Sequence, residues 1–125
     1  MSILTAFNNH FEEFVNDVVR GFPDDMEIAT VATALGKLRK ANPRVIIMTF
    51  KEHVKAPYGS QIEDGKLDFF LEKDYAHDVE GSDKANAILD KIDKIKDPIR
   101  NMKDEEKEKV LKYLQNLCKL CDLYN

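Results

Sequence analysis

The sequence lacks tryptophan, has only two cysteines and three histidines in 125 residues, and contains no long apolar run. Two cysteines cannot form a disulfide framework, so we expect a reducing, intracellular compartment. A helix that spans a bilayer needs about 20 mostly apolar residues, so the sequence predicts no membrane-spanning segment. Residues 1–6 contain no basic side chain, and we therefore expect no secretory signal.

Glycine and proline are also scarce, with five and four residues, whereas 43% of the residues are hydrophobic and 34% are charged. This balance excludes disordered, collagen-like and low-complexity chains. A chain of this length buries about two-thirds of its unfolded surface and can form its own core, so we predict a single helical domain over residues 1–125. The formal net charge of −4 argues against a general nucleic-acid binder.

Apolar residues recur every three or four positions along nearly the whole chain, which is typical of helices. The first helix is expected after Ser2, whose hydroxyl can cap it, and Gly21 and Pro23 should end it. Asp24 or Asp25 is then expected to cap a second helix. Asn42 and Pro43 should end that helix, and Pro43 also suits the first turn of a third helix.

The later helices are predicted from the same signals. We expect residues 56–59 to break the third helix and residues 58–80 to form one or two short helices. The next helix should carry a narrow apolar stripe, and Pro98 should kink or break it. That stripe consists of Ala85, Ile88, Ile92, Ile95 and Ile99. We expect it to pack on the last helix, on Val110, Leu114, Leu117 and Cys121, across a connection near Asn101. The fold class predicted is all-α, an irregular bundle of about five main helices with short helical segments between residues 58 and 80.

Cys118 and Cys121 have the spacing of a redox pair or of half a zinc site. Zinc usually needs four ligands, and the sequence offers no second cysteine pair and no histidine near them. Thioredoxin-like pairs sit at the start of a helix, whereas these two cysteines fall deep within the last predicted helix. We therefore interpret both as buried, reduced, metal-free core residues.

The three histidines do not pair with one another at metal-ligand spacing. His10 and His53 border apolar stripes of predicted helices. A metal site at His77 with Asp74 and Asp78 is an alternative, although a solvated acidic loop is the favoured interpretation. The sequence has no Walker loop, GxSxG or HExxH motif. We expect no enzyme activity, no cofactor and no bound metal.

Positive charge is concentrated in residues 37–55, where six lysines and arginines accompany a single acid, Glu52. Lys37, Lys40 and Arg44 should lie near one helical face at the corner formed by residues 42–43, where they could bind phosphates or an acidic partner. The alternative is an ordinary solvated face that is offset by the acidic segments on either side. No aromatic residue is interleaved with these cations for base stacking, so we do not expect nucleic acid as the partner.

A second candidate for a partner-binding surface is the aromatic segment between residues 58 and 75, which could dock on a neighbouring subunit. The candidate docking residues in this segment are Tyr58, Phe69, Phe70 and Tyr75.

Several short motifs, in order, resemble a group of small helical proteins of nucleocytoplasmic large DNA viruses. They are FEEFVND at residues 11–17, FPD at 22–24, NP at 42–43, FFLEKDY at 69–75, EEK at 105–107 and KYLQ at 112–115. Leu111 stands where the group usually has an aromatic residue, and Lys103 where it has a serine cap. The resemblance implies an all-helical fold and a viral setting, in the host cytoplasm or the virion. It supplies no activity and no catalytic residues.

Two functional hypotheses follow. The first is a non-catalytic structural or interaction protein, such as a minor virion or assembly component that binds other virion proteins. The second is a small regulatory binder of nucleic acid or of an acidic protein, acting through residues 37–55. Salt separates them, because phosphate binding weakens steeply as salt rises whereas an apolar interface does not.

Overall fold

A computed structural model describes residues 2–72 and 83–124, except for the side chains of Phe69 and residues 83–86. The described residues form helices and no strand. In chain order the elements are α1 (Ile3–Gly21), α2 (Met26–Ala41), α3 (Val45–Phe50), the π-helical turn η1 (Lys51–Lys55), α4 (Ala56–Glu63), α5 (Leu67–Glu72), α6 (Asp83–Arg100) and α7 (Asp104–Leu123). Since α3, η1 and α4 follow one another without a break, the described chain has five main helices and one short helix, α5. The predicted all-α bundle is confirmed.

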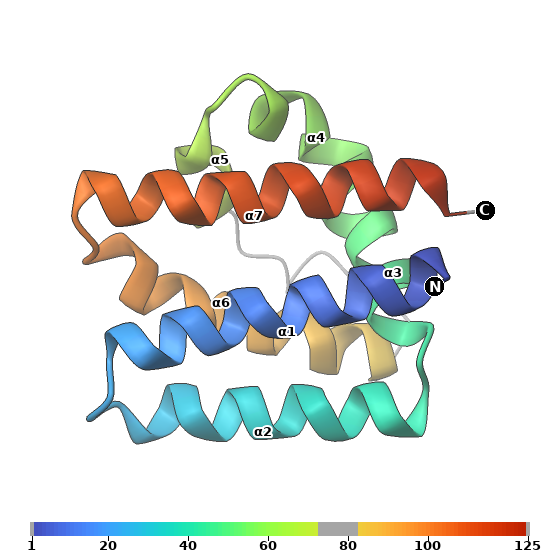
Figure 1. Ribbon diagram of the computed structural model, residues 1–125, viewed down its shortest axis with the longest axis horizontal. Coiled ribbons are helices and arrows are strands. Elements are labelled where there is room, and N and C mark those ends of the chain that lie inside the picture. Colours follow the sequence, from blue (N-terminus) through green and yellow to red (C-terminus); the bar gives the residue numbers. More distant parts are fainter. Residues whose placement is uncertain (1, 73–82, 125) are drawn as a thin grey trace.

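The helix α1 lies between α2 and α7, and the chain runs in opposite directions in each neighbouring pair (Figure 1). Behind them, α6 packs on α2 and α3, and α5 rests on α4 and α6. One end of the bundle brings together the start of α1, the α2–α3 connection, α3 and the end of α7. The opposite end holds the starts of α2 and α7 and the ends of α1 and α6.

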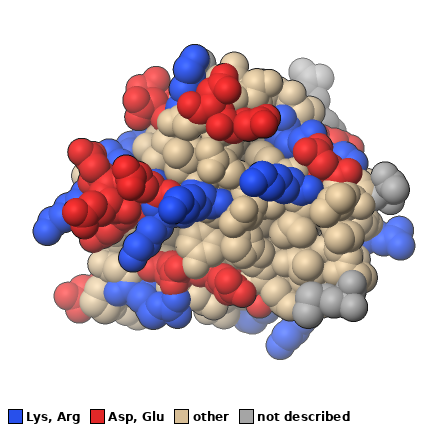
Figure 2. Space-filling view, turned by 45° about the horizontal axis from the view of Figure 1, so that its top comes forward, with Lys and Arg blue, Asp and Glu red and all other residues tan. Residues whose placement is uncertain are grey.

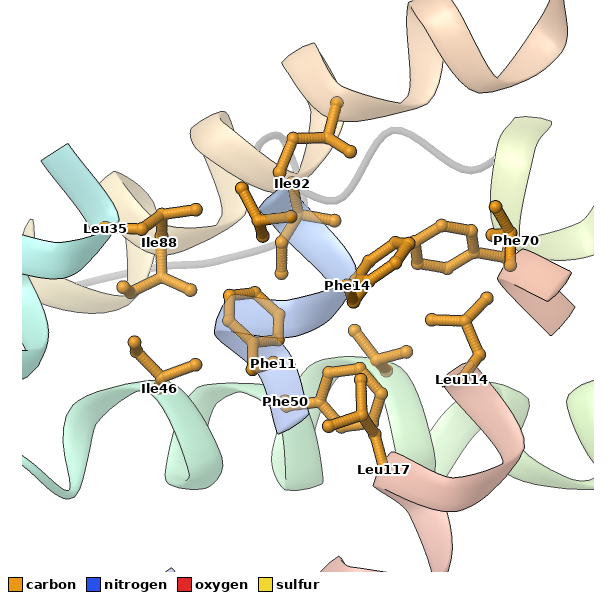
Figure 3. Close-up of a cluster of buried hydrophobic side chains, with 14 of the residues drawn as sticks. Phe11, Phe14, Leu35, Ile46, Phe50, Phe70, Ile88, Ile92, Leu114 and Leu117 are labelled. Carbon is orange, nitrogen blue, oxygen red and sulfur yellow. The ribbon is translucent and has the colours of Figure 1, made fainter. Parts of the chain in front are cut away.

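The core forms where the predicted apolar stripes meet. Figure 3 shows Phe11 and Phe14 of α1 facing Phe50, Phe70 and Leu114, which come from α3, α5 and α7. Further along α6, the isoleucines at 88, 92, 95 and 99 are all buried, as predicted. No helix in the part of the chain that the structure describes is long and apolar enough to cross a membrane.

The helix ends follow the predicted capping residues. The Ser2 hydroxyl accepts a hydrogen bond from the backbone N–H of Thr5 at 3.1 Å, and α1 ends at Gly21. The carboxylate of Asp25, the second of the two candidates, accepts from the N–H of Ile28 at 3.1 Å. These bonds satisfy N–H groups in the first turn that have no partner within the helix.

Neither Pro57 nor Pro98 ends its helix. The expected break at residues 56–59 is wrong, because η1 widens the helix so that the N–H of Ala56 donates to the carbonyl of Lys51. This wide turn directly precedes Pro57, which has no N–H to offer, and the helix continues as α4. Pro98 lies within α6, which continues to Arg100.

The expected pairing of the α6 stripe with α7 is also wrong. The main neighbours of α6 are α2, α3, α1 and α5, whereas α7 packs chiefly on α1 and α4. The apolar stripe of α6 is therefore buried inside the bundle, as expected, but helices other than α7 cover it. A short connection between α6 and α7 does not force them together, and α7 packs on α1 and α4 instead.

Candidate interaction surface

The connection between α2 and α3 is fixed to α1 by a buried amide. Asn8 is 2% exposed, and its Nδ2 donates to the carbonyl of Pro43 at 2.8 Å. The Asn42 side-chain oxygen accepts from the N–H of Arg44 at 3.2 Å, which closes the turn itself. The backbone at this corner is therefore held both locally and from the neighbouring helix.

Three cations surround this connection with their side chains exposed. They are Lys37 and Lys40 on the last turns of α2 and Arg44 just before α3, and together we call them the basic corner. None of the three forms an ion pair within residues 2–72 and 83–124. The three predicted cations thus lie on either side of the connection that Asn8 fixes, and their charges are directed to solvent.

The first of the other cations in residues 37–55 pairs with α1. Arg39 forms a 3.0 Å ion pair with Glu12, and its second guanidinium nitrogen donates to the side-chain oxygen of Asn9 at 2.8 Å. Arg39 therefore stabilises the contact between α1 and α2, and it contributes little free charge to the surface.

The remaining two cations pair with the end of α7. The Lys51 ammonium donates to the carbonyl of Tyr124 at 2.9 Å, and Lys55 forms an ion pair with Asp122. The hydrogen bond with the Asp122 carboxylate raises the pKa of Lys55. The basic stretch is thus divided equally between cations that hold the fold together and cations that face solvent.

An apolar side chain accompanies the basic corner. Met48 lies four residues after Arg44, its N–H donates to the Arg44 carbonyl at 3.1 Å, and it is 49% exposed. Residues four apart share a helix face, so the methionine lies next to the arginine on α3. The surface therefore offers an apolar contact beside its positive charges.

One of the four aromatic candidates, Phe70, is not exposed as we expected. Phe70 is 2% exposed, because α5 turns this ring into the core between α4 and α6. Tyr58 is half-buried and packs against the core. The Phe69 side chain and Tyr75 lie outside the described residues. Phe70 is therefore a core residue in this fold and cannot serve as a docking side chain.

Cys118 and Cys121 are free and buried, as predicted. Burial raises the pKa of the Cys118 thiol from 9.0 to about 11 and that of Cys121 to about 12. Both thiols are therefore protonated near neutral pH, and neither supplies the thiolate that a nucleophilic cysteine requires. The described residues contain no group of three His, Cys, Asp or Glu side chains that could hold a metal ion.

The histidines contact their neighbours individually. The His10 ring lies 4.9 Å from the Tyr113 ring, and His53 is 3.7 Å from the Glu52 carboxylate. His77 and the two aspartates considered with it, Asp74 and Asp78, lie outside the described residues.

Sequence reasoning missed two residues at this surface. Asn8 falls on the apolar face of α1, one turn from both Leu4 and Phe11, and a polar residue at such a position signals a buried hydrogen bond. Met48 gave no comparable signal, because it lies in the apolar run at residues 45–48 and only the packing of α3 shows that it is exposed.

Neither the known protein families, nor the curated proteins, nor the solved structures include a match to this chain.

The raised thiol pKa values predict how stability depends on pH. The unfolded chain releases these protons near pH 9, whereas the folded chain holds them until about pH 11 to 12. Stability should therefore be unaffected below about pH 8 and should fall as the pH rises through 9 towards 11. Urea unfolding at about pH 8 and pH 10 measures this loss. The control is the double variant Cys118→Val with Cys121→Val. It should lose less stability between the two pH values, because it lacks the two thiols while the other titrating groups are unchanged. Equal losses in both proteins would contradict the prediction.

Proposed function

We propose that this chain is a non-catalytic interaction protein that binds an acidic protein surface through the basic corner. The observation that carries the proposal is the division of the cations in residues 37–55. Arg39, Lys51 and Lys55 are bound within the chain, whereas the three cations of the basic corner are exposed on either side of the α2–α3 connection, which Asn8 fixes. A fixed backbone lowers the entropy that ordering the surface costs on binding.

Two further observations support an interaction role. The buried, protonated thiols offer no reactive nucleophile near neutral pH. Met48 adds apolar area beside Arg44, and methionine is enriched at protein interfaces. Nucleic acid remains the second candidate partner, because the same three cations could neutralise phosphates.

The viral setting is part of the proposal and depends on the sequence resemblance alone. In that setting the chain would act in the host cytoplasm or the virion, as a minor particle component or an assembly factor. Quantitative mass spectrometry of purified particles tests this role. Stoichiometric amounts of the chain support it, and absence from the particles contradicts a structural role there.

Reversing the charge of the basic corner should weaken binding to an acidic polypeptide. The variant is Lys37→Glu, Lys40→Glu and Arg44→Glu, and the probe is a fluorescent poly-glutamate peptide followed by anisotropy at low salt. Each exposed ion pair contributes about 0.5 kcal/mol, so losing three should weaken binding at least about 10-fold. Repulsion from the new carboxylates adds to this loss.

The matched control reverses three exposed cations on another part of the surface: Lys66→Glu, Lys112→Glu and Lys119→Glu. It changes the net charge equally but leaves the basic corner intact, so it should bind poly-glutamate more tightly than the corner variant. Equal weakening in both variants would contradict a specific role for the corner. A duplex DNA probe separates the second candidate: corner-dependent binding that favours DNA over poly-glutamate would identify nucleic acid as the partner class.

A further inference from the structure

We propose that the acidic surface bound by the basic corner belongs to a second copy of this chain, which docks head to tail. The inference rests on the proposed function and names its partner. It follows from how the fold separates charge along the bundle, which the linear sequence does not show.

The end of the bundle opposite the basic corner is acidic. Residues 24–27, at the start of α2, contain three acids and no cation, and residues 103–109, at the start of α7, contain four acids and three lysines, so these two segments together carry a net charge of −4. Both helix starts lie at this end (Figure 1), and Figure 2 shows acidic side chains gathered where α7 begins. The exposed acids are Asp24, Glu27, Asp104, Glu105, Glu106 and Glu108. None of them forms an ion pair with another described residue.

Each end also carries an exposed apolar side chain. Only three large hydrophobic residues are exposed in the described part of the chain, and Met26, at 75%, lies directly between the acids of residues 24–27. Met48 and Leu123, at 49% and 63%, lie at the end that holds the basic corner. Interfaces commonly combine an apolar centre with a polar rim. The two ends therefore match in apolar character and oppose each other in charge.

The charge pattern favours head-to-tail docking over a two-fold dimer. A two-fold contact at either end would bring like charges together, and their repulsion grows as the distance between them falls. A head-to-tail contact brings Lys37, Lys40 and Arg44 of one copy against carboxylates of the next. Each pair of copies still has one free acidic end and one free basic corner. Such a contact generates rings or open chains of copies.

A charge-exchange experiment tests this contact. One variant carries Lys37→Glu, Lys40→Glu and Arg44→Glu, and the other carries Asp24→Lys, Glu27→Lys and Glu108→Lys. Circular dichroism first establishes that both remain helical, as substitutions of exposed side chains should. In sedimentation velocity at low salt, the wild type should associate with rising concentration and revert to monomer at high salt. Each variant alone should be monomeric, because all of its ends repel, and an equimolar mixture should associate again.

A wild type that stays monomeric at every concentration would overturn the inference, as would variants that associate like the wild type or a mixture that does not associate. These failures are separable from that of the proposed function. Corner-dependent binding of poly-glutamate by a monomeric wild type would contradict only the second copy as partner. A wild type that neither self-associates nor binds poly-glutamate would contradict both this inference and the proposed function.

Discussion

Replacing Phe11 with alanine is expected to lower the free energy of unfolding by about 4 kcal/mol, because the site lies at the centre of the core. The ring is 1% exposed, its centroid lies 6.2 Å from that of Phe7 in a stacked arrangement, and it lies 6.2 Å from Phe14 edge-on. Its removal takes contacts from helices on several sides at once (Figure 3), so the cavity cannot collapse cheaply. Urea unfolding followed by circular dichroism measures the loss.

The control for this prediction is Leu123→Ala. Leu123 is 63% exposed near the end of α7, and its truncation should change the free energy of unfolding by less than about 0.5 kcal/mol. A Phe11→Ala variant as stable as the Leu123→Ala variant would show that the core is not centred on α1.

Converting Asn8 to aspartate should be nearly as damaging, although it changes a single side-chain group. The amide of Asn8 donates to the Pro43 carbonyl and is 2% exposed. A carboxylate there has no proton to donate and would be buried facing a carbonyl oxygen, at a cost of about 3–5 kcal/mol. Because Pro43 adjoins Arg44, the variant should also weaken poly-glutamate binding by the protein that remains folded.

Asn9→Asp is a matched control, since it makes the same chemical change one residue away. The Asn9 side-chain oxygen already accepts from Arg39 at 2.8 Å and is exposed, so a carboxylate keeps that bond and adds a charge of opposite sign. We expect Asn9→Asp to be neutral or slightly stabilising. Equal destabilisation by the two substitutions would contradict the anchoring role of Asn8.

Much of the fold could be predicted from local patterns. Spacings of three and four residues identified the buried faces of α1, α2, α6 and α7, because a helix repeats every 3.6 residues. Ser2, Asp25 and Gly21 marked helix ends, because their effects act within one turn. The π-helical turn before Pro57 escaped prediction, since the proline signal is the same whether the helix breaks or widens.

The arrangement of the helices and the paired cations could not be predicted in this way. An apolar stripe specifies which face of α6 is buried, but not that α2 and α3 rather than α7 cover it. The partners of Arg39 and Lys51 are Glu12 and the carbonyl of Tyr124, which are distant in sequence. Which cations remain exposed is therefore a property of the folded chain, and it decides where the candidate surface lies.

The most direct test of a head-to-tail contact through the basic corner is a concentration series of ¹H–¹⁵N correlation spectra at low salt. The account predicts concentration-dependent changes in two sets of amides, one at residues 37–48 and the other at residues 24–27 and 104–108, both of which disappear at high salt. Spectra that do not change with concentration, or changes confined to other parts of the surface, would contradict it.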